Sequence, residues 1–303
     1  MNFRSLWFVL LPVLLLSACG QNWNDPYPRR DEGKAVLYTV FEERPKHLDP
    51  ARSYSSNEVE FTGQIYEPPL QYHFLKRPYT LEPLTAVSMP LVRYWDAAGN
   101  ELPASAPPEK ITRSTYDIRI KPGIRYQPHP AFALLPDGQP RYLGLQEKDL
   151  EHINTLRDFP YTGTRELTAD DYVYEIKRLA SPRLSSPIFG LMTEYIEGLG
   201  PFNEQVEKAA DRLPKGAWLD LRAFDLSGVR VLDRYTYRIT LKSFYPQFIY
   251  WLAMPFFAPV PWEAERFYAQ PGMEERNLNL DWFPVGTGPF LLAENDPNRR
   301  MIL

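Results

Sequence analysis

The stretch "LTADDYVYEIKRLASP", residues 167–182, predicts a helix with a defined start and a defined end. Thr168 and Asp171 have the spacing of a capping box. Pro182 cannot continue the helix. Between them, apolar side chains recur at helical spacing: Val173, Ile176, Leu179 and Ala180. The adjacent carboxylates of Asp170 and Asp171 are therefore interpreted as first-turn acids that face the helix dipole, and not as a catalytic pair.

Segments on either side of this helix predict strands. Residues 115–120 alternate polar and apolar side chains and end at Lys121-Pro122-Gly123, where glycine accepts a positive φ. Residues 228–241 predict two strands around a turn, and the apolar run "AVLYTVF", residues 35–41, predicts a buried strand. Residues 247–257 are aromatic, apolar and expected to be buried. Because helices and strands alternate irregularly, we expect an α/β chain with mixed sheets.

The composition permits a large core and excludes some partners. The chain has 303 residues, a net charge of -4 and 44% apolar residues, which suffices for one large domain or two ordinary ones. No basic patch indicates a nucleic-acid partner. The 31 prolines, scattered among aromatic residues, favour long ordered loops. Two stretches have the composition of insertions, residues 96–110 and residues 201–220, and the second predicts a short surface helix followed by a loop.

The first twenty residues predict export and lipidation. Residues 6–16 form an apolar run that is too short to span a membrane and fits a signal peptide. Residues 16–20, "LSACG", resemble a bacterial lipobox, and Cys19 is the only cysteine of the chain. We expect residues 1–18 to be a lipoprotein signal peptide, Cys19 to carry the lipid, and residues 19–34 to be a tether. The alternative is an ordinary secretory signal in which Ala-Cys is accidental. Either reading indicates the periplasm or cell envelope, and which membrane would hold the anchor stays open.

No pattern of catalytic, metal-binding or cofactor-binding residues occurs. Gly286 and Gly288 could suggest a phosphate loop, but Pro289 and a strand-like run follow them where a helix is needed. The sequence contains no Gly-x-Ser-x-Gly motif. None of the histidines has the spacing of a metal site: His47, His73, His129 and His152. We therefore expect no enzyme activity, no metal and no cofactor.

Five segments together resemble the bacterial extracellular solute-binding proteins of family 5, the oligopeptide- and dipeptide-binding receptors of ABC importers. They occur in the order known for that family: "HLDPARSYSSNEVEFTGQIYEPPL" (47–70), "YDIRIKPGIRYQ" (116–127), "LTADDYVYEIKRL" (167–179), "GVRVLDRYTYRITLKSFYPQF" (228–248) and "PVGTGPF" (284–290). Each segment alone is a modest signal, and the five frame about 250 residues.

The resemblance implies one lobe of a type II periplasmic-binding-protein-like clamshell. In this interpretation, residues 35–66 begin lobe I, residues 67–261 form its extra subdomain and residues 262–303 return to lobe I. The chain is then expected to be truncated, with the second lobe missing, as a fragment or through a disrupted gene. Residues 20–303 alone are expected to bind no ligand tightly and to expose apolar surface.

The resemblance also implies a function. The protein is expected to be a lipid-anchored receptor that captures a small solute and delivers it to a permease and ATPase. Peptide is the leading solute, and nickel chelates, haem, sugars and opines are alternatives. By spacing, the ligand loop falls on Tyr54, Ser55 and Ser56, which could otherwise be a plain solvent loop. Ile188 and Phe189 stand where peptide binders present an aromatic residue to the ligand.

The segment Gly286-Thr287-Gly288-Pro289 is interpreted as a structural turn. Its glycines are expected either to take positive φ or to allow close packing. Two other functional classes are alternatives to the receptor. An exported hydrolase on a similar scaffold lacks any visible nucleophile. An envelope sensory or interaction protein on the same fold stays open as an alternative.

Overall fold

The computed structural model describes residues 31, 33–214 and 216–303, and the chain divides into two compact units, residues 1–42 and residues 43–303. In the first unit, residues 35–41 form neither strand nor helix, and Leu37 and Val40 are exposed. The prediction of a buried strand there is wrong. An apolar run becomes a strand only when a neighbouring strand pairs with its backbone, and none of the strands in the described residues does so.

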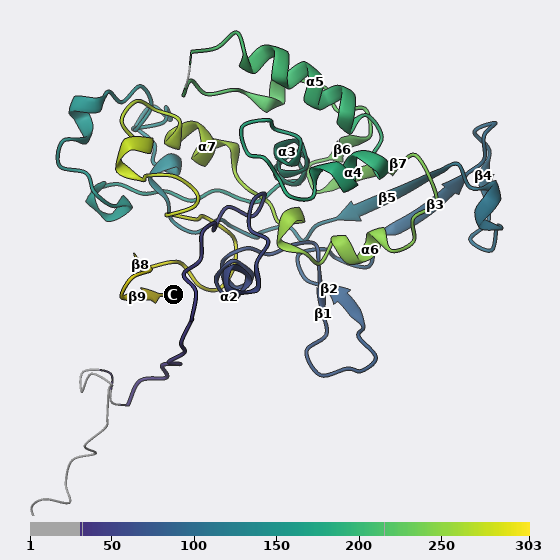
Figure 1. Cartoon of the computed structure of the whole chain (residues 1–303), viewed down its shortest axis with the longest axis horizontal. Coiled ribbons are helices and arrows are strands. Elements are labelled where there is room, and N and C mark those ends of the chain that lie inside the picture. Colours follow the sequence, from purple (N-terminus) through teal and green to yellow (C-terminus); the bar gives the residue numbers. More distant parts are fainter. Residues whose placement is uncertain (1–30, 32, 215) are drawn as a thin grey trace, which may run out of the picture. The chain divides into compact units, whose positions relative to one another are not determined.

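The second unit is built around a five-stranded antiparallel sheet with the order β4-β3-β5-β7-β6 (Figure 1). Its strands are β3 (Leu91–Trp95), β4 (Glu101–Leu102), β5 (Arg113–Arg119), β6 (Val229–Asp233) and β7 (Thr236–Leu241). The strands predicted near 115–120 and within 228–241 are confirmed. In β7, every second side chain is buried, which gives the sheet one apolar face: Tyr237, Ile239 and Leu241.

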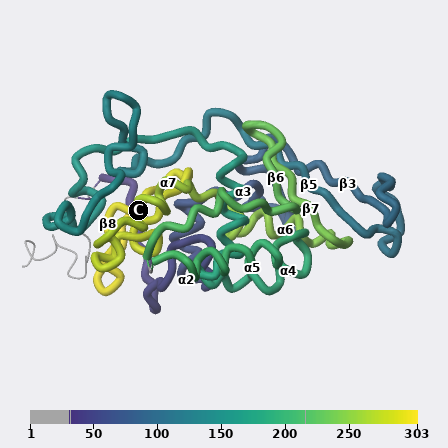
Figure 2. Tube along the Cα trace, turned by 90° about the horizontal axis from the view of Figure 1, so that it is seen from above, coloured from purple at the N-terminus to yellow at the C-terminus, as the bar shows by residue number. Residues whose placement is uncertain are grey.

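Helix α3 (Ala169–Leu179) packs on the apolar face of this sheet, against β6 and β7 (Figure 2). The predicted capping box is confirmed, because the amide of Thr168 donates to Asp171 Oδ2 at 2.9 Å. The ring of Tyr172 in α3 stacks on Tyr237 of β7 with 5.1 Å between the centroids. The predicted turn after β5 is also confirmed, because Gly123 has a φ of +84°.

Short elements surround this core. The other helices of the described residues are α2 (Ser56–Ile65), α4 (Phe189–Tyr195), α5 (Leu199–Ala210), α6 (Phe248–Trp251) and α7 (Trp262–Tyr268). Two hairpins pair β1 (Leu70–Tyr72) with β2 (Leu81–Pro83) and β8 (Glu294–Asp296) with β9 (Arg300–Ile302). Single turns of 3-10 helix lie at Pro108–Lys110, Pro130–Phe132, Glu147–Leu150, Leu156–Asp158, Leu221–Ala223, Pro255–Phe257 and Glu274–Arg276.

The two stretches with the composition of insertions lie at the edges of this unit. Residues 96–110 contain the turn after β3, strand β4 and a 3-10 turn. Residues 201–220 contain most of α5, so the predicted helix is confirmed. One hydrophobic core runs from Ala51 to Val285 through residues 43–303. The boundaries near 66 and 261 inside this unit stay predictions. Among the described residues, no helix has both the length and the apolar character needed to cross a membrane.

Candidate functional site

The loop before α2 is held in shape by the buried carboxylate of Glu58, which is 3% exposed. Glu58 Oε1 accepts the amides of Lys46 at 3.1 Å and His47 at 2.9 Å, and Oε2 accepts those of Tyr54 at 2.9 Å and Ser55 at 3.2 Å. Burial disfavours ionisation of this carboxyl, but the amide hydrogen bonds together outweigh it, so the pKa of Glu58 is lowered. One side chain therefore fastens two separate segments of the loop.

The residues predicted to contact a ligand are displayed by this fixed loop. Tyr54, Ser55 and Ser56 are exposed, and Tyr54 is 70% exposed. The Tyr54 ring lies near the Phe256 ring, with 6.1 Å between the centroids and 42° between the ring planes. Among the described residues, no hydrogen bond reaches the Tyr54 carbonyl oxygen. The loop thus presents an aromatic side chain, two small serines and a free backbone carbonyl to solvent, while its backbone is held by Glu58.

Beneath the loop, the turn at residues 48–50 is tied to α3 by a buried ion-pair cluster around Arg178, which is 0% exposed. The guanidinium donates to both Asp49 oxygens, at 3.0 and 2.6 Å, in a bidentate pair. It also donates to Glu175 at 2.8 Å and to Glu265 at 3.2 Å. The hydroxyl of Tyr174 donates to the second oxygen of Glu265. This cluster joins three parts of the chain that are far apart in sequence.

The ion-pair cluster contains more carboxyl groups than guanidinium groups, and this affects the pKa of Glu175. A single guanidinium faces three carboxyl groups, those of Asp49, Glu175 and Glu265. Burial, which is the largest effect, raises the pKa of Glu175 well above its ordinary range, although Arg178 opposes it. A proton on Glu175 would reduce the excess negative charge around the single guanidinium from two units to one.

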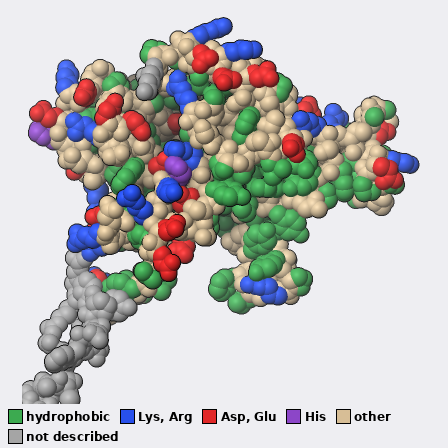
Figure 3. Space-filling model, viewed as in Figure 1, with side chains coloured by type: hydrophobic (Ala, Val, Ile, Leu, Met, Phe, Trp, Pro, Cys, Tyr) green, Lys and Arg blue, Asp and Glu red, His purple; other side chains and the backbone are tan. Residues whose placement is uncertain are grey.

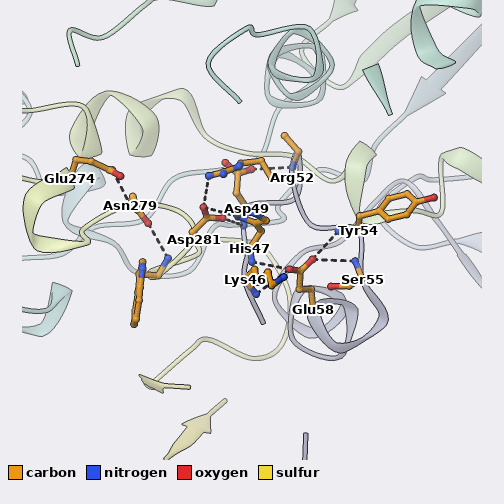
Figure 4. Close-up of polar contacts among 12 residues, drawn as sticks. Lys46, His47, Asp49, Arg52, Tyr54, Ser55, Glu58, Glu274, Asn279 and Asp281 are labelled. Carbon is orange, nitrogen blue, oxygen red and sulfur yellow. Dashed lines mark hydrogen bonds and ion pairs between the residues drawn. The ribbon is translucent and has the colours of Figure 1, made fainter. Parts of the chain in front are cut away.

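Asp281 ties the same turn to the C-terminal part of the chain (Figure 4). Asp281 Oδ1 accepts a hydrogen bond from the amide nitrogen of Asp49 at 3.2 Å. Asp281 Oδ2 accepts one from Arg52 Nη1 at 2.5 Å. His47 Nδ1 lies 3.2 Å from the same Oδ2. Burial first, and the nearby Asp49 second, raise the pKa of Asp281, while Arg52 and His47 act in the opposite direction. The base of the loop is therefore fixed from α2, α3 and the segment before residue 284.

The segment at residues 284–290 closes the other end of α2. The Gly288 amide donates to the Ile65 carbonyl at 2.9 Å, and the Phe290 amide to the Gln64 carbonyl at 3.3 Å. These carbonyls have no partner within the helix, so the turn caps α2 from outside. A Cβ on Gly286 would lie 1.9 Å from the Ile65 oxygen. Close packing therefore explains the glycines, and neither Gly286 nor Gly288 has a positive φ.

A cavity of about 910 Å³ opens beside the ion-pair cluster. Its volume suits a small-molecule ligand. Its lining combines the charged groups of the cluster with apolar and aromatic side chains, among them Asp49, Arg52, Arg178, Trp218, Leu221 and Glu265. None of the five residues predicted to contact a ligand lines this cavity. The exposed loop and the cavity are thus two distinct candidate surfaces.

The remaining predicted site residues lie elsewhere. Ile188 is buried in the hydrophobic core and Phe189 is half-buried at the start of α4, so the structure does not present Ile188 to solvent. Cys19 lies outside the described residues. Among the described residues, no group of three or more His, Cys, Asp or Glu side chains is arranged to hold a metal ion.

Glu58, Arg178 and Asp281, which organise the site, were not predicted from the sequence, and only the first two have a local signal. Glu58 stands three residues after Ser55, and this Ser-x-x-Glu spacing is itself a capping-box signal that could have identified it. Arg178 follows Glu175 at the i, i+3 spacing in α3, which indicates a pair but not its burial.

The comparisons with known proteins identify one family. Residues 153–303 match the family described as "Bacterial extracellular solute-binding proteins, family 5 Middle". No curated protein sequence matches the chain.

Several solved structures are similar in fold. The murein tripeptide binding protein MppA of Escherichia coli is 17% identical, with a TM-score of 0.50, over 86% of this chain and 36% of that one. OppA of Burkholderia pseudomallei is 17% identical, with a TM-score of 0.50, over 85% and 35%. The periplasmic oligopeptide-binding protein OppAIV of Borrelia burgdorferi is 16% identical, with a TM-score of 0.50, over 85% and 36%. The present chain thus spans little more than a third of the length of these proteins, and the predicted α/β fold class is confirmed. The expectation of mixed sheets is wrong, because every strand pair among the described residues is antiparallel.

Proposed function

Residues 153–303 place this chain in family 5 of the bacterial extracellular solute-binding proteins, and on that premise we propose that the protein is the solute-binding subunit of an ABC importer. Peptide is the proposed solute. The similar proteins of E. coli and B. burgdorferi are described as tripeptide- and oligopeptide-binding, which supports this choice.

The observation that carries the proposal is the loop fixed by Glu58. It displays Tyr54, Ser55 and Ser56 to solvent while its backbone is held by four amide hydrogen bonds. A preformed surface loses little conformational entropy when a ligand arrives. The Tyr54 carbonyl can accept an amide of an extended peptide, as in the addition of a strand, and the small serines let a peptide backbone approach.

We further propose that this chain forms one side of the solute site. The similar proteins are much longer, and only 36% of E. coli MppA has a counterpart here. A one-sided site makes few contacts, so the affinity of residues 1–303 for a short peptide is expected to be about 1 mM or weaker.

Peptide binding is tested by titrating the 303-residue chain with pools of tri- to pentapeptides and measuring the affinity by microscale thermophoresis. We expect weak saturable binding that Tyr54→Ala reduces and that Trp218→Ala, in the cavity, leaves unchanged. The opposite pattern would move the site to the cavity. Binding that neither substitution changes, or no binding by any peptide, would contradict the proposal, and micromolar affinity would contradict the one-sided site.

Lipid anchoring at Cys19 is a separate part of the proposal and rests on the lipobox-like residues 16–20 alone. Cells that express the chain are fed an alkyne-bearing fatty acid, and the purified protein is examined for the label. We expect labelling of the wild type and none of Cys19→Ser. Equal labelling of both would contradict anchoring at this residue.

The proposed partners are a permease and an ATPase of the importer type. Affinity purification from the native envelope after crosslinking tests this. Recovery of permease subunits supports the importer, whereas recovery of a sensor kinase in their place would favour the sensory alternative.

A further inference from the structure

The β1–β2 hairpin ends in a loop, residues 73–80, that projects from the rest of residues 43–303 (Figure 1). The loop reads "HFLKRPYT". At its tip, Phe74 is 87% exposed and Leu75 is 77% exposed. Figure 3 shows this hairpin as a knob on which hydrophobic and cationic side chains lie together. Two neighbouring large apolar side chains in water are unfavourable unless another surface covers them.

The loop has a defined conformation that keeps these side chains outside. The His73 amide donates to the Thr80 carbonyl at 2.8 Å. His73 Nδ1 accepts the amides of Leu75 and Lys76, each at 3.2 Å. Arg77 Nη1 donates to the Lys76 carbonyl at 2.9 Å. The polar groups of the loop thus bond to one another, and the apolar tip points away from the hairpin.

The charge of the loop is entirely positive. Lys76 and Arg77 are both exposed, and no Asp or Glu occurs between residues 72 and 81. This contrasts with the whole chain, which carries a net charge of -4. The Arg77 guanidinium lies over the Tyr79 ring, 4.4 Å from its centroid, so its charge is kept beside the apolar residues.

Exposed tyrosines follow behind the tip. Tyr72 contacts Tyr79 edge-on, with 5.9 Å between centroids, and stacks on Tyr250 of α6 at 6.3 Å. All three rings are partly exposed. Tyrosine is favoured at the boundary between lipid chains and water, because its ring is apolar and its hydroxyl bonds to headgroups.

We propose that residues 73–80 insert into an anionic lipid surface. Phe74 and Leu75 would enter the outer acyl region, while Lys76, Arg77 and the tyrosines meet the headgroups. Charge complementarity favours lipid over a second copy of the chain, because two such tips would bring like charges together. The proposal does not depend on the solute that the protein binds or on the lipidation of Cys19.

A fluorescent label on the tip tests this. In the full chain with Cys19→Ser, Leu75→Cys is labelled with NBD, and vesicles of phosphatidylcholine and phosphatidylglycerol are added. We expect a blue shift of the emission and quenching by lipids with brominated chains. Adding Lys76→Ser or Arg77→Ser should lower the ratio of inserted to free tip about fivefold for each charge removed.

The matched control is Leu134→Cys with the same label, since Leu134 is also an exposed leucine in a loop, at 58%. A label at position 134 detects attachment of the chain to vesicles through residues other than the hairpin tip. We expect no blue shift and no quenching of this label. The proposal is overturned by an unchanged spectrum at position 75, by equal responses at 75 and 134, or by equal insertion into pure phosphatidylcholine. A response that requires native membranes, or one that grows with protein concentration without lipid, would identify a protein partner or a second copy and would also overturn it.

Discussion

Arg178 is the residue on which the internal order of the site depends most. Its guanidinium holds Asp49 of the loop base, Glu175 of α3 and Glu265 of α7 without contact with water. A buried charge of this kind adds little net stability compared with apolar packing, but removing one partner leaves uncompensated charges inside. We infer that Arg178 holds the turn at residues 48–50 in a single position through its pair with Asp49.

We expect Arg178→Ala to lower the free energy of unfolding by about 3–5 kcal/mol, because the buried carboxyl groups of Asp49 and Glu175 lose the cation that pairs with them. Glu175→Gln should cost less than about 1 kcal/mol, since the raised pKa of Glu175 indicates that a neutral side chain already fits there. Urea unfolding at neutral pH measures both. Equal losses for the two variants would show that Glu175 is ionised in the folded protein.

We expect Glu58→Ala to lower the free energy of unfolding by about 1–3 kcal/mol at neutral pH, because four partly buried amides lose their acceptor. The pKa of Glu58 is lowered by folding, so its contribution is complete above the ordinary value of 4.5 and is lost as the pH falls through the folded value. The difference between wild type and variant should therefore shrink below pH 4.5.

The matched control is Glu60→Ala, an exposed glutamate of the same helix. It should change stability by less than about 0.5 kcal/mol at any pH. A Glu58 effect that is constant down to strongly acidic pH would contradict the role given to its carboxylate.

At the scale of elements, the contact between α2 and residues 284–290 fixes the loop from its far end. We expect Gly286→Ala to cost at least about 2 kcal/mol, because the new Cβ would lie 1.9 Å from the Ile65 carbonyl oxygen and backbone cannot rotate away. Gly190→Ala is the control. Gly190 lies inside α4, where an added Cβ would meet nothing within 4 Å, so the change should be neutral or stabilising by up to about 1 kcal/mol. Thermal unfolding of both variants measures this, and similar effects would contradict the close-packing account.

The elements differ in how far the sequence could predict them. Helix α3 and the β6–β7 hairpin carry local signals in their caps, periodicity and turns, and both were predicted. Residues 35–41 were not predicted correctly. Their apolar side chains suit a strand, but a strand forms only where a neighbouring strand pairs with its backbone. Gly286 packs against the carbonyl of Ile65, more than two hundred residues earlier in the chain. The glycine indicates that some group packs closely there, but the sequence does not show which group it is.

The same limit applies to the candidate site. The assignment of Tyr54, Ser55 and Ser56 to a ligand loop came from their spacing within one short segment that resembles the family, and their contact with a ligand stays a prediction. The Arg178–Asp49 pair joins residues 129 positions apart, and the Asp281–Asp49 contact joins residues 232 positions apart. No local pattern predicts which charged residues a fold will bring together, whereas Glu58 had a local signal in its capping box.

At the scale of the whole molecule, residues 43–303 share one core, and its parts converge on the loop before α2. Glu58 fixes the loop from within α2, Arg178 from α3 and Asp281 from the C-terminal segment. The same unit carries the projecting β1–β2 hairpin. The chain therefore has two proposed binding surfaces, one for a solute and one for a lipid surface.

Binding of a peptide on the Tyr54–Ser56 loop can be observed residue by residue with NMR. Amide chemical shifts of the isotope-labelled 303-residue chain are followed while a mixed tripeptide pool is added to millimolar concentration. We expect the shifts to change progressively at residues 53–57, and Tyr54→Ala to abolish those changes. Changes confined to the residues of the cavity around Trp218, or none at residues 53–57, would contradict the account.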